Sequence, residues 1–151
     1  MRVLVQRSLK SSVKVDNKIV GNIDNGLVLL VGFTYGDNSD IIDYMVDKVL
    51  NLRIFDDEKG VMNKSLLEVG GDILSISQFT LYADSRKGRR PSYVNALTGS
   101  EAVKLYDLFN ERLGKYIKVE TGIFGAEMEV NITNDGPITI LLERNSDKYE
   151  K

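Results

Sequence analysis

Residues 25–33 read Asn25-Gly26-Leu27-Val28-Leu29-Leu30-Val31-Gly32-Phe33, and this stretch decides the fold. The Asn-Gly pair is a turn signal, and every residue from Leu27 to Val31 is apolar. A strand that is apolar on both of its faces is typical of the centre of a sheet. The sequence therefore predicts a central strand that begins directly after a turn.

The rest of the chain supplies shorter strand signals and two helices. Apolar residues recur at helical spacing over 39–52, with Ser39 as the expected N-cap, and over 100–114, where Ser100 can cap the helix. The connection over 83–98 is long and irregular, and such connections often carry function. Strand signals, which are mostly alternations of apolar and polar residues, are found over 3–8, 12–16, 18–21, 72–79, 117–120, 127–133 and 138–143.

The order of these elements predicts an α+β fold. We expect a curved or closed, mainly antiparallel, β-barrel-like sheet with two principal helices packed on it. Strands and helices do not alternate regularly, which argues against a doubly wound parallel sheet. The chain has 151 residues and no linker-like segment, so we expect one domain over 1–151 with a polar tail over about 145–151.

The composition excludes several kinds of chemistry. The chain has no Cys and no His, which removes thiolate nucleophiles, imidazole bases, catalytic triads and Cys- or His-ligated metal sites. Catalysis would have to use hydroxyls, carboxylates, Lys, Arg, main-chain groups or groups of the substrate. We expect no cofactor and no metal.

Charge and hydropathy indicate where the protein acts. The start of the chain carries Arg7 where a signal peptide is apolar, and the longest apolar run is far shorter than the roughly 20 residues that span a bilayer. We therefore expect a cytoplasmic protein without a membrane partner. The net charge of −2 argues against a surface that coats nucleic acid, DNA included, but allows a small basic patch for one nucleic-acid end.

Three short segments could carry chemistry. Ser77-Gln78-Phe79-Thr80-Leu81 ends a hydrophobic strand, where main-chain N–H groups become free to bind a ligand oxygen; equally, Phe79 and Leu81 could be core residues. Asn134-Asp135-Gly136-Pro137 has the residues of a hairpin turn. Arg86-Lys87-Gly88-Arg89-Arg90 is either a solvated loop or a phosphate contact, with Lys87, Arg89 and Arg90 as the candidate ligands.

Taken together, the segments resemble the D-aminoacyl-tRNA deacylase family. The matching stretches fall in the family's order over nearly the whole chain, and Ile138 stands where Val is commoner. They are Met1-Arg2-Val3-Leu4-Val5-Gln6-Arg7, Ser77-Gln78-Phe79-Thr80-Leu81, Gly88-Arg89-Arg90-Pro91-Ser92, Thr121-Gly122-Ile123-Phe124-Gly125-Ala126 and Asn134-Asp135-Gly136-Pro137-Ile138-Thr139.

The resemblance implies a homodimer that hydrolyses the ester between a D-amino acid and the 3′-terminal ribose of tRNA, and that also acts on glycine mischarged on tRNA(Ala). Ser77, Gln78, Phe79 and Thr80 would form one catalytic wall. Gly136-Pro137, with a cis peptide, would reach in from the partner subunit to exclude L side chains, held by Arg7. Phe124 and Ala102 would line the terminal-adenosine pocket.

This chemistry suits a chain without His or Cys. An aminoacyl ester is already activated, main-chain N–H groups near Phe79 and Thr80 could stabilise the oxyanion, and the 2′-hydroxyl of the ribose could activate water. We expect Thr80 to act through its main chain, because no general base lies near it in the sequence. Two alternatives remain: a non-catalytic module that binds RNA 3′ ends through Phe79 and the basic cluster, and a general esterase that uses Thr80 or Ser77.

Overall fold

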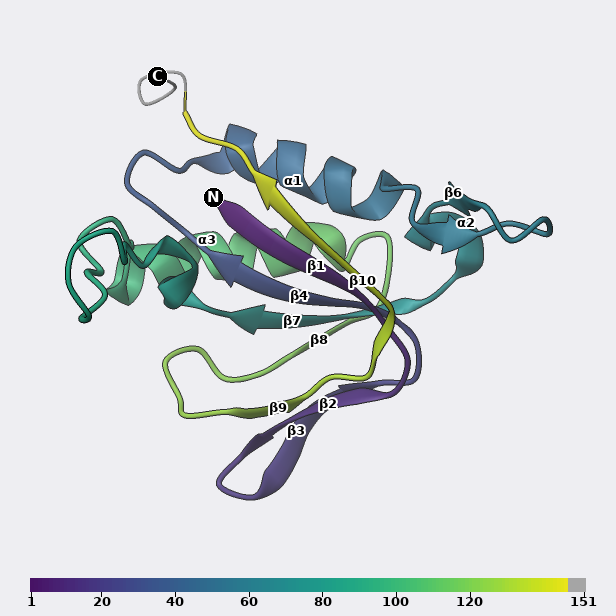
Figure 1. Ribbon diagram of the computed structural model, residues 1–151, viewed down its shortest axis with the longest axis horizontal. Helices are drawn as coiled ribbons and strands as arrows, with labels where there is room; N and C mark the ends of the chain where they lie inside the picture. The colour runs from purple at the N-terminus through teal and green to yellow at the C-terminus, as the bar shows by residue number, and fades with distance from the viewer. Residues whose placement is uncertain (147–151) are drawn as a thin grey trace.

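The computed structural model describes residues 1–146 (Figure 1). Two long helices and one short helix are present in this part of the chain: α1 (Ser39–Asn51), α2 (Leu66–Val69) and α3 (Gly99–Leu113), with a 3-10 turn, η1 (Phe79–Tyr82). The strands are β1 (Arg2–Ser8), β2 (Ser11–Val15), β3 (Lys18–Ile23), β4 (Gly26–Gly32), β5 (Phe55–Asp56), β6 (Met62–Lys64), β7 (Asp72–Ser77), β8 (Val119–Thr121), β9 (Glu129–Asn131) and β10 (Asn134–Glu143).

The main sheet is mixed and open. Its five strands follow the order β10-β1-β4-β7-β8, with β1 antiparallel to both neighbours and β7 parallel to both of its own. The predicted α+β class and the two long helices are confirmed, but the mainly antiparallel, closed sheet is wrong for the residues described. The physical reason is that α1 and α3 lie in the connections β4–β7 and β7–β8, and such crossovers return the chain parallel to the strand it left.

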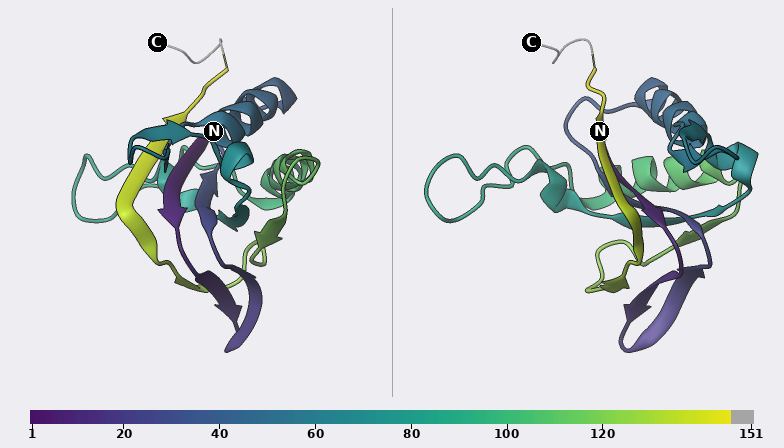
Figure 2. Two further views of the ribbon diagram at one scale, coloured as in Figure 1. Left: turned by 90° about the vertical axis from the view of Figure 1, so that its right-hand side faces the viewer. Right: turned by 45° about the vertical axis from the view of Figure 1, so that its right-hand side comes forward.

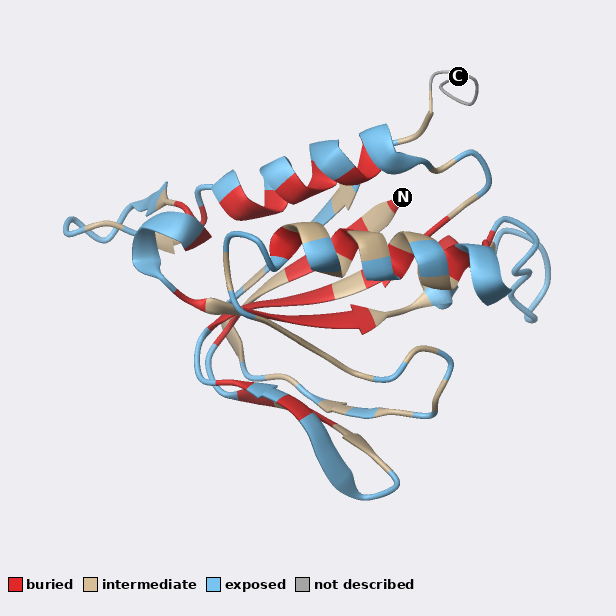
Figure 3. Cartoon of the chain, turned by 180° about the vertical axis from the view of Figure 1, so that it is seen from behind, coloured by how far each residue is buried: buried red, intermediate tan, exposed pale blue. Residues whose placement is uncertain are grey.

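Strand β4 is buried on both faces, as its apolar run predicted. Leu27, Leu29 and Val31 pack with the buried faces of α1 and α3, while Val28 joins a second cluster with Leu74. Figure 3 shows the buried side of each long helix turned toward the sheet. The second cluster lies toward the small sheet β3-β2-β9, so the chain has two apolar layers around its central strand.

The two long helices begin earlier than their predicted caps imply, α1 by one residue and α3 by two. The side chain of Asn38, not Ser39, caps α1 by accepting hydrogen bonds from the N–H groups of Asp40 and Ile41. Helix α3 begins at Gly99 after Thr98 rather than after a cap at Ser100. Both differences follow from neighbouring residues that suit a cap equally well in sequence, so that only the local backbone decides between them.

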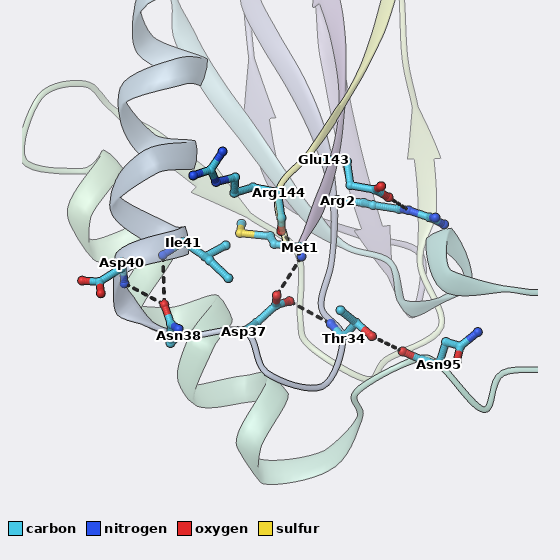
Figure 4. A network of polar contacts seen from close by, with 10 residues as sticks. All are labelled: Met1, Arg2, Thr34, Asp37, Asn38, Asp40, Ile41, Asn95, Glu143 and Arg144. Atoms are coloured by element: carbon cyan, nitrogen blue, oxygen red, sulfur yellow. Dashed lines mark hydrogen bonds and ion pairs between the residues drawn. The ribbon is translucent and has the colours of Figure 1, made fainter. Parts of the chain in front are cut away.

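The start of the chain is held by a buried ion pair (Figure 4). The Met1 ammonium donates to Asp37 Oδ1 at 2.8 Å and to the Arg144 carbonyl oxygen at 2.9 Å, and Asp37 Oδ2 accepts from Thr34 N–H. Burial lowers the pKa of the Met1 amine and raises the pKa of the Asp37 carboxyl, and their mutual contact opposes both shifts. This contact ties β1 to the loop before α1.

Among residues 1–146, no helix has the length and apolar character needed to span a membrane. The predicted polar tail begins within the described chain at Asn145, but 147–151 lie outside the described residues.

Candidate active site

A pocket of about 520 Å³ opens where β7 ends beside the start of α3. Five of the predicted site residues line it: Ser77, Gln78, Phe79, Ala102 and Phe124. The other lining residues are mostly apolar or glycine, and they are Val31, Gly32, Phe33, Ile76, Leu97, Thr98, Gly99, Gly125, Ala126, Met128 and Val130. The structure therefore brings together predicted site residues that are distant in sequence, since 47 positions separate Ser77 from Phe124.

The wall from Ser77 to Thr80 is the point where β7 becomes a 3-10 turn. The Gln78 N–H donates the last ladder bond, to the Val31 carbonyl oxygen at 2.7 Å, and η1 begins at Phe79. The first N–H groups of a helical turn have no partner within it, and those of Phe79 and Thr80 donate to no protein atom in the described part of the chain. Two neighbouring main-chain donors are thus free at the edge of the pocket.

Side chains on this wall are ordered by local contacts. The Thr80 hydroxyl donates to Gln78 Oε1 at 2.7 Å, and an amide oxygen cannot serve as the general base of a nucleophile. Thr80 itself is exposed and does not line the pocket. Phe79 is half-exposed and meets the edge of Tyr93, with ring centroids 5.2 Å apart.

The opposite wall is fixed by α3. Tyr106 lies one turn after Ala102, and its hydroxyl donates to the Ser75 carbonyl oxygen of β7 at 2.7 Å. Its ring also contacts that of Phe124, at 5.7 Å between centroids. Burial raises the pKa of the Tyr106 phenol, which keeps the hydroxyl protonated as a donor. Tyr106 lies within the helix predicted over 100–114, and helical spacing alone does not indicate this link between the two walls.

Gly32 is a second residue that the sequence analysis did not assign to the site. A β-carbon at this position would lie 2.8 Å from the Gln78 carbonyl oxygen and 3.2 Å from Leu81 Cβ, so a side chain cannot fit between β4 and η1. The signal was available, because a glycine at the end of a buried apolar run indicates close approach of another backbone.

Gly136 and Pro137 form a bulge and not a hairpin turn. Strand β10 already begins at Asn134, and its pairing with β1 passes from Ser8↔Asn134 to Gln6↔Thr139. Four residues, 135–138, therefore stand opposite the single residue Arg7. The hairpin-turn interpretation of this segment is wrong, and the Gly136–Pro137 peptide is cis.

Arg7 contacts the base of this bulge. Its guanidinium Nε lies 3.1 Å from Asp135 Oδ2, in an ion pair that is not aligned as a hydrogen bond, and its Nη1 donates to the Ile54 carbonyl oxygen at 2.9 Å. A weaker contact reaches Asp56 at 3.5 Å. Arg7 thus joins the bulge to the start of β5 within the same chain.

The bulge lies far from the pocket of its own chain. It is opposite Arg7, which is level with Leu27 of β4 and Ile73 of β7, whereas the pocket begins on β7 at Ile76. Three strand spacings and three residues of rise separate the two, about 14 Å across the sheet and about 10 Å along it. Figure 1 shows β10 beginning and β7 ending at opposite ends of the sheet, and neither Gly136 nor Pro137 lines the pocket.

The basic cluster lies on a loop next to the pocket wall. Asp84 and Ser92 pair through two main-chain hydrogen bonds of 2.8 Å, and the loop between them stands away from the sheet (Figure 2, right). Arg86 makes a two-pronged contact with Asp84 and lowers the pKa of that carboxyl to about 2. Lys87, Arg89 and Arg90 are exposed on the same loop.

The fold and the site define an α+β protein with a ligand pocket whose wall is a strand end with free main-chain donors. The chain belongs to the D-Tyr-tRNA(Tyr) deacylase family, whose model matches residues 4–143.

Relatives named D-aminoacyl-tRNA deacylase match nearly the whole chain. The protein from Clostridium perfringens (strain 13 / Type A) is 58% identical over 144 residues, which is 95% of this chain and 97% of that protein. The protein from Bacillus cytotoxicus is 55% identical over 144 residues, which is 95% of this chain and 99% of that protein.

Two solved structures share the fold. A protein titled c-Myc DNA Unwinding Element Binding Protein is 38% identical, with a TM-score of 0.91 over 97% of this chain and 100% of that one. A probable eukaryotic D-amino acid tRNA deacylase is 21% identical, with a TM-score of 0.79 over 93% of this chain and 97% of that one, and supports the fold alone.

Proposed function

We propose that this protein hydrolyses the ester bond of D-aminoacyl-tRNA and releases the free D-amino acid and tRNA. The observation that carries the proposal is the match to the deacylase family and to its named relatives over almost the entire chain. The pocket at the end of β7 supports it, because free main-chain donors beside an apolar cavity suit an ester carbonyl flanked by an adenosine.

The proposed reaction uses water and the substrate's own ribose. Water attacks the ester carbonyl carbon, and the oxyanion that forms accepts from the N–H groups of Phe79 and Thr80, each worth about 2.7–4 kcal/mol of transition-state stabilisation. The 2′-hydroxyl of the terminal ribose takes a proton from the water and passes a proton to the 3′ oxygen. The bond between the carbonyl carbon and the ribose 3′ oxygen then breaks, and the 3′-hydroxyl is the leaving group.

The tRNA end is recognised by two regions around the wall. The terminal adenosine occupies the apolar part of the pocket between Ala102 and Phe124, which both line it. Phosphates of the acceptor strand contact Lys87, Arg89 and Arg90, which are exposed on the loop adjoining Tyr93 and Phe79. Such contacts hold the RNA backbone without reading its sequence.

Selection against L-amino acids comes from a second copy of the chain. The Gly136–Pro137 bulge is about 14 Å across and about 10 Å along the sheet from its own pocket, so it can act on a pocket only by entering that of a partner. There its main-chain carbonyl groups would collide with an L side chain, whereas a D side chain points to solvent. Glycine has no side chain to exclude, so glycine mischarged on tRNA(Ala) is also a substrate.

Deacylation of D-Tyr-tRNA beside L-Tyr-tRNA, with and without the purified protein, tests this function. Rapid loss of the D ester alone supports it, and equal rates on both esters contradict the exclusion mechanism. Two other results would replace the proposal: tight binding of deacylated tRNA without hydrolysis indicates an RNA 3′-end module, and cleavage of small activated esters without tRNA indicates a general esterase. Light scattering at assay concentration measures whether the protein is a dimer.

A further inference from the structure

The side chain of Asn134 lies at the base of the Gly136–Pro137 bulge and uses both ends of its carboxamide. Its Nδ2 donates to the carbonyl oxygens of Arg7 and Ile138, each at 3.0 Å. Its Oδ1 accepts from Gln6 Nε2 and from the Thr139 hydroxyl, each also at 3.0 Å. One side chain therefore joins both ends of the bulge to β1.

These contacts replace the strand pairing that the bulge interrupts. Four residues of β10 face one residue of β1, so the regular ladder is interrupted opposite Arg7, whose carbonyl then needs a donor from elsewhere. The Asn134 amide supplies that donor and also reaches Ile138, the last residue of the bulge. The distance between the two ends of the bulge is thereby fixed by a single group.

Thr139 extends the same network to the proline. Its hydroxyl lies 3.0 Å from Asn134 Oδ1 and 3.3 Å from the Pro137 carbonyl oxygen, and with one proton it donates to one of them at a time. The Pro137 carbonyl, which we expect to face an L side chain, is thus linked to Asn134 through the Thr139 hydroxyl.

We propose that Asn134 is a positioning residue that sets the direction in which the Gly136–Pro137 bulge projects, and so determines the rejection of L-aminoacyl-tRNA. This inference rests on the proposed exclusion mechanism. An asparagine suits the position because the site presents two carbonyl acceptors on one side and two donors on the other. A carboxylate of the same shape would place an oxygen against the carbonyl groups of Arg7 and Ile138.

The test is a gain of activity on the wrong substrate, which a merely structural role does not produce. Asn134→Asp is compared with Asn131→Asp, a matched change at an exposed residue of β9, three positions earlier. We expect Asn134→Asp to hydrolyse L-Tyr-tRNA roughly tenfold faster than the control, while its rate on D-Tyr-tRNA falls by less than about tenfold. Thr139→Val should shift the same ratio in the same direction, and it replaces Asn134→Asp if that variant does not fold.

Pro137→Ala, measured in parallel, separates this inference from the function on which it rests. Loss of D/L selectivity in both Pro137→Ala and Asn134→Asp supports both. Loss in Pro137→Ala alone overturns the role of Asn134 and leaves the exclusion mechanism standing. Loss in Asn134→Asp alone supports the inference, because the main-chain carbonyls and not the proline ring then carry the selection. Unchanged selectivity in all variants overturns the exclusion mechanism and the inference with it.

Discussion

Replacing Thr80 by valine separates a main-chain role from a nucleophilic role. The change keeps the shape of the side chain and removes only the hydroxyl, whose contact is the 2.7 Å hydrogen bond to Gln78 Oε1. The N–H group of Thr80, which we propose as an oxyanion donor, stays in place. The variant therefore tests the side chain without disturbing the main-chain chemistry.

The structure fixes the size of the expected effect. Thr80 is exposed, and a hydrogen bond between neutral groups contributes about 0.5–1.5 kcal/mol, so looser positioning of Gln78 should slow deacylation by roughly 2- to 13-fold. If the hydroxyl were the nucleophile, its removal would lower the rate by roughly a millionfold, as removal of a catalytic serine does.

Single-turnover deacylation of D-Tyr-tRNA, with protein in excess, measures this effect directly on the ester-cleaving step. Circular dichroism of the same preparation shows that the variant is folded. Thr98→Val offers a matched control at a residue that lines the pocket and whose side chain makes no capping hydrogen bond. A loss of more than about a thousandfold in a folded Thr80→Val protein would refute the main-chain mechanism and favour an acyl-enzyme.

Three further changes have effects that follow from single contacts. Gly136→Ala is expected to lose L-rejection or stability, because its φ is 115° and the new β-carbon would lie 2.8 Å from Ile138 Cγ1; D- and L-Tyr-tRNA assays beside a thermal melt measure both. Asp37→Ala should lower the free energy of unfolding by about 3–5 kcal/mol in urea titration, because it leaves the terminal ammonium buried without its partner. Arg86→Ala should return the pKa of Asp84 from about 2 toward 3.8 in an NMR titration; the depressed pKa contributes stability above pH 3.8 that is lost as the pH falls toward 2, so an unchanged midpoint would contradict this pairing.

The central strand and the long helices were predictable because each has a pattern of its own. The apolar run of β4 indicates burial on two faces, and the helical spacing after Asn38 and before Gly114 places the ends of α1 and α3 to within two residues. The direction of strand pairing did not follow from the residues of the strands, since parallel and antiparallel strands of this length have similar residues. The helices between β4, β7 and β8 were predicted, but they impose parallel pairing only if these strands are neighbours, and the sequence does not reveal that order.

Some features were missed although the sequence contains their signal. Ser65 and Glu68 form a capping box at the start of α2, a pattern that a search for Ser followed by Glu three residues later would find. The bulge at Gly136 could not be found in this way, because its turn-forming residues also suit a hairpin and register depends on pairing with β1. Of the five pocket residues, Ser77, Gln78 and Phe79 were candidates because they end a hydrophobic strand. Ala102 and Phe124 were named through the family resemblance, since nothing local in either residue indicates that they meet Ser77.

The separation of the bulge from its own pocket bears on what happens when the proposed dimer comes apart. A single copy would keep its hydrolytic wall but would have nothing to exclude L-aminoacyl-tRNA. It would therefore hydrolyse the correctly charged tRNA that translation uses. Association must then be tight at cellular abundance, because dilution would turn a selective enzyme into an indiscriminate one. By the same logic, a copy with a damaged pocket and a copy with a damaged bulge should complement each other when mixed, since one intact site can form between them.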